Sequence, residues 1–242
     1  MPQTSTFVSQ SDVEYRETVN KVGERRRIST FFPDKNGPMG FLMLVPERNQ
    51  ITTHFHRVNQ FQVLFPSDGA RYRRTPIDDV LVHYADGYAT YGPITTTVSS
   101  LEMFTLRAIH DDFRADMPAE REKLVRRGKR NLHGSVASTL TGSSSVESLF
   151  EDGSDGLFAG VARTGPGGSI STIDASGGGG QYHCILSGTA QLDGKSYVAK
   201  SLLWMTAGDA PRSIVAGSEG LVLLTVQFPV GSREIDGQIG TS

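Results

Sequence analysis

The sequence has very little cysteine, with one cysteine at position 184 among 242 residues. A single cysteine excludes an intramolecular disulfide framework, and a thiolate metal cluster would need more than one. We therefore expect the protein to occupy a reducing compartment.

An excess of positive charge is also lacking. The chain has 24 Lys and Arg against 26 Asp and Glu, which gives a formal net charge of -2. A nucleic-acid-binding surface would need a basic excess on one face. We therefore expect no nucleic-acid partner.

Long apolar runs are missing as well. The longest apolar stretch, LVLLTVQF at 221–228, has the length of a strand, whereas a membrane-spanning helix needs roughly 18 apolar residues. The N-terminal residues show no apolar core after a basic start, as a secretory signal would. We expect a cytoplasmic protein with no membrane partner.

What the sequence does contain is a series of short apolar runs separated by turn residues. There are 27 glycines and 11 prolines, with runs of Val, Ile, Leu, Phe and Thr between them. This composition is typical of an all-β sandwich or barrel. The predicted strands of the first half are 40–46, 51–56, 60–65, 79–86 and 101–108.

The charged run MPAEREKLVRRGKR at 117–130 interrupts this pattern. Pro118 suits the first position of a helix, and Glu120 suits the positive end of the helix dipole. We predict a short helix between two domains, with its charges in solvent. The predicted organisation is an N-terminal domain with an irregular arm at 1–116, a helical connector at 117–137 and a C-terminal domain at 138–242.

The two strand-rich halves repeat each other. QFQVLFPSDG, which starts at Gln60, aligns with QYHCILSGTA, which starts at Gln181. A second block aligns His83 with Trp204, and a third block aligns the predicted strands near residues 105 and 225. Three matching blocks in the same order, about 120 residues apart, predict a duplicated β-domain.

Two histidines lie two residues apart on the predicted strand 51–56. Because side chains alternate across a strand, His54 and His56 point to the same face, and Gln60 and Gln62 repeat this spacing on the next strand. The inside of a small barrel is normally apolar, so inward polar groups would need hydrogen bonds or a metal. The alternative is that this face is solvated, since hydrophobicity does not distinguish the two faces of the strand.

The stretch THFHRVNQFQVLFPSDG resembles the first motif of the cupin family, which has the form H-x-H, three or four residues, Glu, and then a glycine about six residues on. His54 and His56 match the two histidines, Gln60 takes the place of the glutamate, and Gly69 matches the second glycine of the run E-x-x-Y-V-L-x-G-x-G that is usual in this motif. The resemblance extends over both repeats. It implies a bicupin, with two jelly-roll β-barrels joined by the short helical connector.

Two departures from the cupin pattern concern the metal ligands. The acid is replaced by the neutral Gln60, a weaker ligand, and the stretch that resembles the second motif, GYATYGPITTTVSS, contains no histidine. The resemblance implies a divalent metal (Fe, Mn, Ni or Zn) held by His54, His56 and Gln60. In the second repeat the histidine positions fall on Ala175 and Gly177, which cannot bind a metal.

The resemblance places the activity in the first barrel. It implies a metal-dependent enzyme that acts on a small, oxygen-rich organic substrate by oxygenase (dioxygenase), isomerase or lyase chemistry. His83 and Tyr91 are candidates for acid–base catalysis, and Gln62, Tyr84 and Arg71 for substrate binding. The alternative is a metal-free bicupin that binds or senses a small molecule. A homodimer is a possible assembly on the same resemblance.

Overall fold

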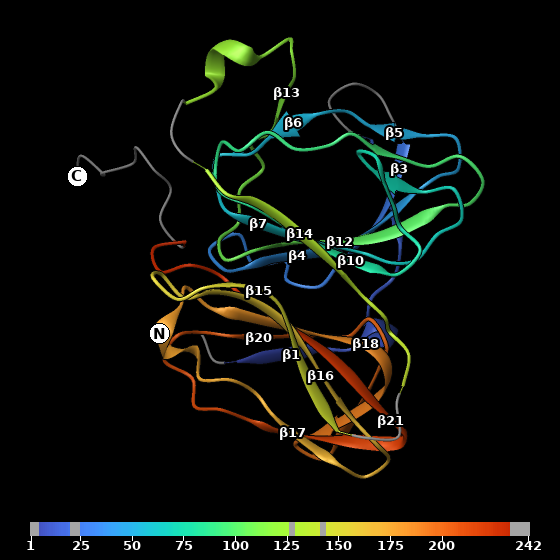
Figure 1. Ribbon diagram of the computed structural model, residues 1–242, viewed down its shortest axis with the longest axis vertical. Coiled ribbons are helices and arrows are strands. Elements are labelled where there is room, and N and C mark those ends of the chain that lie inside the picture. Colours follow the sequence, from blue (N-terminus) through green and yellow to red (C-terminus); the bar gives the residue numbers. More distant parts are fainter. Residues whose placement is uncertain (1–4, 20–24, 126–128, 141–143, 233–242) are drawn as a thin grey trace. The chain divides into compact units, whose positions relative to one another are not determined.

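A computed structural model describes residues 5–19, 25–125, 129–140 and 144–232. Apart from 3-10 segments of three residues, its regular elements are strands (Figure 1). The prediction of an all-β protein is confirmed. Within the described residues, no helix is long and apolar enough to cross a membrane.

The chain forms two compact units. Of the described residues, those within 14–135 together with Ser232 form the first unit, called the first barrel below, and those within 5–13 and 136–231 form the second barrel. The arm predicted to belong to the N-terminal domain therefore belongs in part to the second barrel. Its strand β1 (Thr6–Val8) pairs antiparallel with β20 (Leu202–Met205), and Phe7 stacks on Tyr197 at 3.6 Å between ring centroids. Strand pairing and apolar burial explain why the arm is ordered there.

The main sheet of the first barrel has seven strands in the order β14-β10-β7-β12-β4-β3-β2. Smaller sheets, in the orders β5-β11-β8-β9 and β13-β6, complete this barrel. Apolar residues on alternating positions of β4, β7, β10 and β12, such as Met43, Leu64 and Leu81, form its buried core. The strands are β2 (Arg16–Val19), β3 (Arg25–Thr30), β4 (Met39–Val45), β5 (Gln50–Ile51), β6 (His54–Phe55), β7 (Gln60–Leu64), β8 (Arg71–Tyr72), β9 (Thr75–Pro76), β10 (Val80–Ala85), β11 (Ile94–Thr95), β12 (Leu101–Arg107), β13 (Ala115–Asp116) and β14 (Asn131–Val136).

The second barrel contains one eight-stranded sheet with the main order β1-β20-β18-β21-β16-β15, in which β17 pairs with β21 and β19 with β18. Ile185, Leu203 and Leu223 are among its buried core residues. The remaining strands are β15 (Ser145–Asp152), β16 (Leu157–Thr164), β17 (Ser169–Ser171), β18 (Gln181–Leu192), β19 (Lys195–Val198) and β21 (Ser213–Gln227).

The predicted duplication is visible in the strand order, because β10-β7-β12-β4-β3 and β20-β18-β21-β16-β15 are equivalent series. One predicted match is wrong by a residue. Gln62 pairs with His83, and its counterpart His183 pairs with Leu203. His83 therefore corresponds to Leu203 rather than to Trp204. A slip of one residue matters because it moves a side chain to the other face of the sheet.

The helix predicted at 117–130 is not formed by the described residues of that segment, which exclude 126–128. A single 3-10 turn covers Arg121–Lys123, and the chain then enters β14, so part of the predicted connector is a strand of the first barrel. The segment has no apolar stripe at helical spacing, and a short helix without such a face is marginal in water. Glu120 instead accepts a hydrogen bond from the Asp116 backbone N–H at 2.8 Å.

Candidate functional site

A cavity of about 530 Å³ lies in the first barrel. Its polar wall comes from the inward positions of β7 and β12 and from the chain around β6, and its apolar wall from β3, β4 and β5. Both histidines of the H-x-H motif line this cavity, so the prediction that they share an inward face is confirmed. The polar lining includes His54, His56, Gln60, Gln62, Tyr91 and Arg107.

His54 is held through its backbone and through one nitrogen of its ring. Its backbone forms a bridge with Tyr91, with N–O distances of 3.0 and 3.1 Å, and its Nδ1 lies 2.6 Å from the carbonyl oxygen of Thr52. Burial, with a smaller effect of the Arg114 cation, lowers the pKa of His54 to about 3. The neutral ring donates its Nδ1–H to Thr52, so Nε2 carries a lone pair.

His56 lies beside His54, with ring centroids 5.2 Å apart and perpendicular planes. Its Nδ1 contacts the carbonyl oxygen of Phe113 and is 3.0 Å from Nη2 of Arg107. Burial and the Arg107 cation hold the pKa of His56 well below its usual range, so the ring is neutral. If Nδ1 donates to the Phe113 carbonyl, Nε2 carries a lone pair; if Nδ1 accepts from Arg107, Nε2 carries the hydrogen and is a donor.

Arg107 is the central residue that the sequence analysis did not identify. Its side chain is 3% exposed, and Nε and Nη2 donate to Oε1 of Gln60 at 2.9 and 2.7 Å. Nη1 donates to the backbone carbonyl of Asp111. Gln60 in turn donates from Nε2 to the hydroxyl of Tyr91 at 2.5 Å. The signal was in the sequence, because Arg107 is two residues from the inward Thr105 on the same strand.

The loop after β12 is held by a second arginine. Nε and Nη2 of Arg57 donate to Oδ1 of Asp111 at 2.9 and 2.6 Å. Asp111 is buried, and the ion pair fixes the carbonyl that receives Arg107. The guanidinium of Arg107 is therefore fixed in position before any ligand arrives.

These residues do not fit the metal centre that the cupin resemblance implies. Among the residues that the structure describes, no group of three or more His, Cys, Asp or Glu could hold a metal ion. The oxygen of Gln60, the expected third ligand, is occupied by Arg107, whose charge beside His56 opposes a divalent cation. The structure brings His54, His56 and Gln60 together, but their role as metal ligands stays a prediction.

Two of the other predicted residues line the cavity and one lies behind it. Gln62 and Tyr91 are on the wall, whereas His83 is fully buried and does not contact the cavity. Nδ1 of His83 is 3.0 Å from Oε1 of Gln62, and Nε2 is 3.1 Å from Oδ1 of Asn131. Burial lowers the pKa of His83 to about 3. A neutral, enclosed ring of this kind supports the wall, and its predicted catalytic role has no contact with the cavity to support it.

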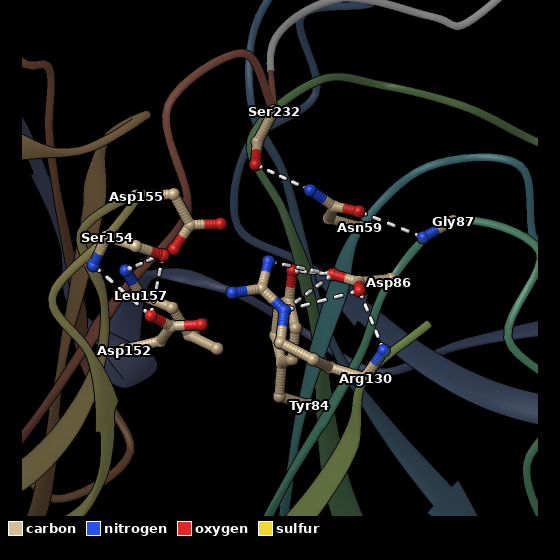
Figure 2. A network of polar contacts seen from close by, with 10 residues as sticks. All are labelled: Asn59, Tyr84, Asp86, Gly87, Arg130, Asp152, Ser154, Asp155, Leu157 and Ser232. Atoms are coloured by element: carbon tan, nitrogen blue, oxygen red, sulfur yellow. Dashed lines mark hydrogen bonds and ion pairs between the residues drawn. The ribbon is translucent and has the colours of Figure 1, made fainter. Parts of the chain in front are cut away.

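Tyr84 and Arg71 do not line the cavity, in contrast to the prediction. Tyr84 alternates with His83 on β10 and donates to Asp86 at 2.6 Å, and the same carboxylate pairs with Arg130 at 3.1 Å (Figure 2). Arg71 is exposed, and its Nη1 donates to the carbonyl of Arg74 at 3.2 Å. Strand alternation explains Tyr84, and solvation of a strand end explains Arg71.

The equivalent positions of the second barrel form a closed network of neutral side chains. Gln181 donates to Gln227 at 2.7 Å and lies 3.0 Å from Nε2 of His183, whose Nδ1 is 2.9 Å from Thr225. Gln227 donates to the carbonyl of Gly156 at 2.6 Å. Gln227 occupies the place of Arg107, because it pairs with Gln181 as β12 pairs with β7. The charged group at this position is thus confined to the first barrel.

Several solved structures share this architecture over nearly the whole chain. A bacterial pirin from Escherichia coli, solved in complex with nickel(II), is 9% identical, with coverage of 94% of this chain and 100% of its own and a TM-score of 0.59. An oxalate decarboxylase from Lactobacillus farciminis, solved as a formate complex, is 11% identical, with coverage of 95% and 87% and a TM-score of 0.56. An 11S allergen from Cocos nucifera is 9% identical, with coverage of 93% and 89% and a TM-score of 0.58. The chain has a bicupin fold.

The bicupin fold consists of two jelly-roll domains, as the sequence resemblance implied. No family model matches the sequence, and no curated protein matches it either. The similar structures include a decarboxylase, a nickel complex and an 11S allergen, so the fold does not determine the chemistry. The function of this bicupin has to be argued from its own cavity.

Proposed function

We propose that the first barrel of this bicupin binds a small organic anion, and that the cavity does so without a resident metal. The observation that carries the proposal is the charge of the lining. Four arginines and one aspartate line the cavity, although the whole chain has a net charge of -2. Positive charge gathered in a cleft with low-dielectric walls attracts anions. The charged lining residues are Arg16, Arg26, Arg107, Arg114 and Asp112.

Arg107 and Tyr91 supply the directional part of this recognition. The contacts with Gln60 and the Asp111 carbonyl fix the Arg107 guanidinium, so little entropy is lost when an anion binds beside it. Burial raises the pKa of Tyr91 to about 12, so its hydroxyl keeps its proton at neutral pH. The Tyr91 hydroxyl accepts from Gln60, and its own hydrogen is available to an anionic oxygen.

The rest of the lining selects for an apolar body. Ile28, Phe41, Met43 and Ile51 face the same cavity from β3, β4 and β5. Binding sites for small molecules commonly combine such apolar walls with a few fixed polar groups. The preferred ligand is therefore a carboxylate with a hydrocarbon chain rather than a fully hydrophilic anion.

A metal-dependent enzyme is the second candidate, and one observation favours it. His54 donates Nδ1–H to a backbone carbonyl and has a lone pair on Nε2, which is how metal-ligating histidines are usually oriented. The predicted oxygenase, isomerase or lyase chemistry belongs to this candidate. It requires one metal equivalent per chain, held by His54 and His56 with other ligands from outside the protein.

Calorimetric titration of the full chain, purified without a histidine tag and treated with a chelator, separates the two candidates. We expect octanoate to bind and octylammonium not to bind. We also expect Arg107→Lys to lower the affinity for octanoate, whereas substitution of the exposed Arg71, Arg71→Lys, should leave that affinity unchanged. Equal binding of both octyl compounds would contradict the anion site. About one equivalent of Fe, Mn, Ni or Zn in the untreated protein, lost in His54→Ala/His56→Ala, would favour the enzyme.

The cytoplasmic location and the homodimer remain proposals.

A further inference from the structure

The cavity has positive charge at two separate places. Arg107 on β12 lies at the inner wall beside the two histidines, and it is buried. Arg16 on β2 and Arg26 on β3 line the same cavity from the edge of the sheet, where Arg16 is exposed. The polar wall with Gln60 is thus not the only place where an anionic group could be held.

The strand register gives the separation of the two places. β12, β4, β3 and β2 are consecutive in the sheet. Arg107 pairs with Met39, whereas Arg16 pairs with Ile28, which pairs with Met43 on β4. Across the strands, three spacings of about 4.8 Å separate the backbone positions of Arg107 and Arg16 by roughly 14 Å. Along the strands, four residues of about 3.4 Å each add a separation of roughly 14 Å in the perpendicular direction. Long arginine side chains shorten the gap, but one carboxylate cannot contact both ends.

The surface between the two ends is apolar. Phe41 and Met43 of β4 and Ile28 of β3 lie between Arg107 and Arg16 in the register and line the cavity. A hydrocarbon spacer is the chemical group that such a surface favours.

On the basis of the proposed function, we infer that the ligand is an elongated dicarboxylate with a hydrocarbon spacer. One carboxylate binds beside Arg107 and Tyr91, and the other binds between Arg16 and Arg26. The spacer lies on Phe41 and its apolar neighbours. The inference depends on the anion site, and it adds a second anchoring point and a length requirement.

The same strands offer a matched control. Residues on a strand alternate between its faces, so Arg25 and Arg27 of β3 point away from the face of Arg26. Arg25 lies 3.5 Å from Glu17, and Arg27 lies over the ring of Tyr15 at 5.1 Å. Neither lines the cavity. Arg25→Gln/Arg27→Gln therefore removes the same charge from the same hairpin as Arg16→Gln/Arg26→Gln.

The test is calorimetric titration of the chelator-treated full chain with octanoate, suberate and oxalate. We expect suberate to bind more tightly than octanoate, and oxalate, which has no spacer, to bind weakest. In Arg16→Gln/Arg26→Gln we expect suberate to lose about fivefold in affinity, as two partly exposed charge pairs would give, with octanoate changed less than about twofold. The control double variant should retain suberate affinity.

Two results would overturn the inference while leaving the anion site intact. One is octanoate binding more tightly than suberate, because a pocket with a single cationic end penalises burial of a second carboxylate. The other is an equal loss of suberate affinity in the two double variants, since that would trace the effect to overall charge. If neither octanoate nor suberate binds, the proposed function itself fails.

Discussion

Four buried histidines make the stability of this bicupin depend on pH, and three of them are in the first barrel. Burial lowers the pKa of His54, His83 and His183 to about 3, and the pKa of His56 lies well below its usual range. The unfolded chain takes up a proton on each ring below its ordinary pKa of about 6.5, whereas the folded chain does not. The stability that these rings contribute is therefore complete above pH 6.5 and is lost as the pH falls from 6.5 toward about 3.

The loss can be estimated for pH 5. Each ring is then about 1.5 pH units below its unfolded pKa, which corresponds to about 2 kcal/mol per histidine. The first barrel, with three such rings, should lose roughly 6 kcal/mol, and the second barrel, with His183 alone, roughly 2 kcal/mol. A typical domain has only about 5–15 kcal/mol of stability. We expect the first barrel to unfold in mild acid while the second is still folded.

The assay uses the single tryptophan of the chain, Trp204, which lies in the second barrel. Urea unfolding between pH 7.5 and 4.5, followed by tryptophan fluorescence, reports the second barrel, and hydrogen exchange of peptides from residues 25–125 reports the first. A parallel loss of stability in both barrels, or no loss above pH 5, would refute the reasoning.

Three further predictions concern single residues, each measured by urea unfolding at pH 7. Gln60→Glu places a carboxylate on the Arg107 fork and loses the amide N–H that Tyr91 accepts, but the Tyr91 hydroxyl can donate to the carboxylate instead. The first barrel should gain about 1 kcal/mol, and this gain should be lost as the pH falls through the depressed pKa of the new acid; a clear destabilisation would contradict this geometry. Arg107→Met leaves two buried acceptors unpaired and should lower the free energy of unfolding by about 2–4 kcal/mol. The control Arg71→Met should change it by no more than about 0.5 kcal/mol. Equal costs would argue against the hydrogen-bond network. Gly156 has φ +80°, and a Cβ added there would lie 1.9 Å from a carbonyl oxygen, so Gly156→Ala should cost about 3 kcal/mol or more of stability. Gly194 has a similar φ of +74° but no atom within 4 Å of an added Cβ, so Gly194→Ala should cost only about 1 kcal/mol. Similar losses in the two variants would contradict the steric explanation.

The sequence was informative where strand periodicity and the repeat acted together. Alternation placed His54, His56 and Gln62 on one face, and all three line the cavity. The same rule, applied to β10, would have put His83 and Tyr84 on opposite faces, so the two could not both belong to one wall. The pattern of β10 therefore excludes a wall that contains both side chains, and the sequence alone contains this information.

Other features depended on tertiary contacts that local patterns do not report. The arm that carries β1 has little periodicity, and its partner strand β20 is nearly 200 residues further along the chain. The segment 117–130 has helical signals at its two ends but no apolar face, and the absence of that face outweighed them. Arg107 lies outside the residues of the cupin motif, so the resemblance does not point to it.

Gln60 and Arg107 have to be interpreted together. A carboxylate at position 60 could accept from Arg107 but could not donate to the Tyr91 hydroxyl, whereas the amide does both. The departure from the cupin glutamate is therefore part of a complete hydrogen-bond network rather than the loss of a ligand. In the second barrel the neutral Gln227 takes the place of Arg107, and the hydrogen bond runs the other way, with Gln181 donating to Gln227. Because Arg107 gives this position a charge that Gln227 lacks, the anion should be recognised in the first barrel, and Arg107 should be a residue on which that recognition depends.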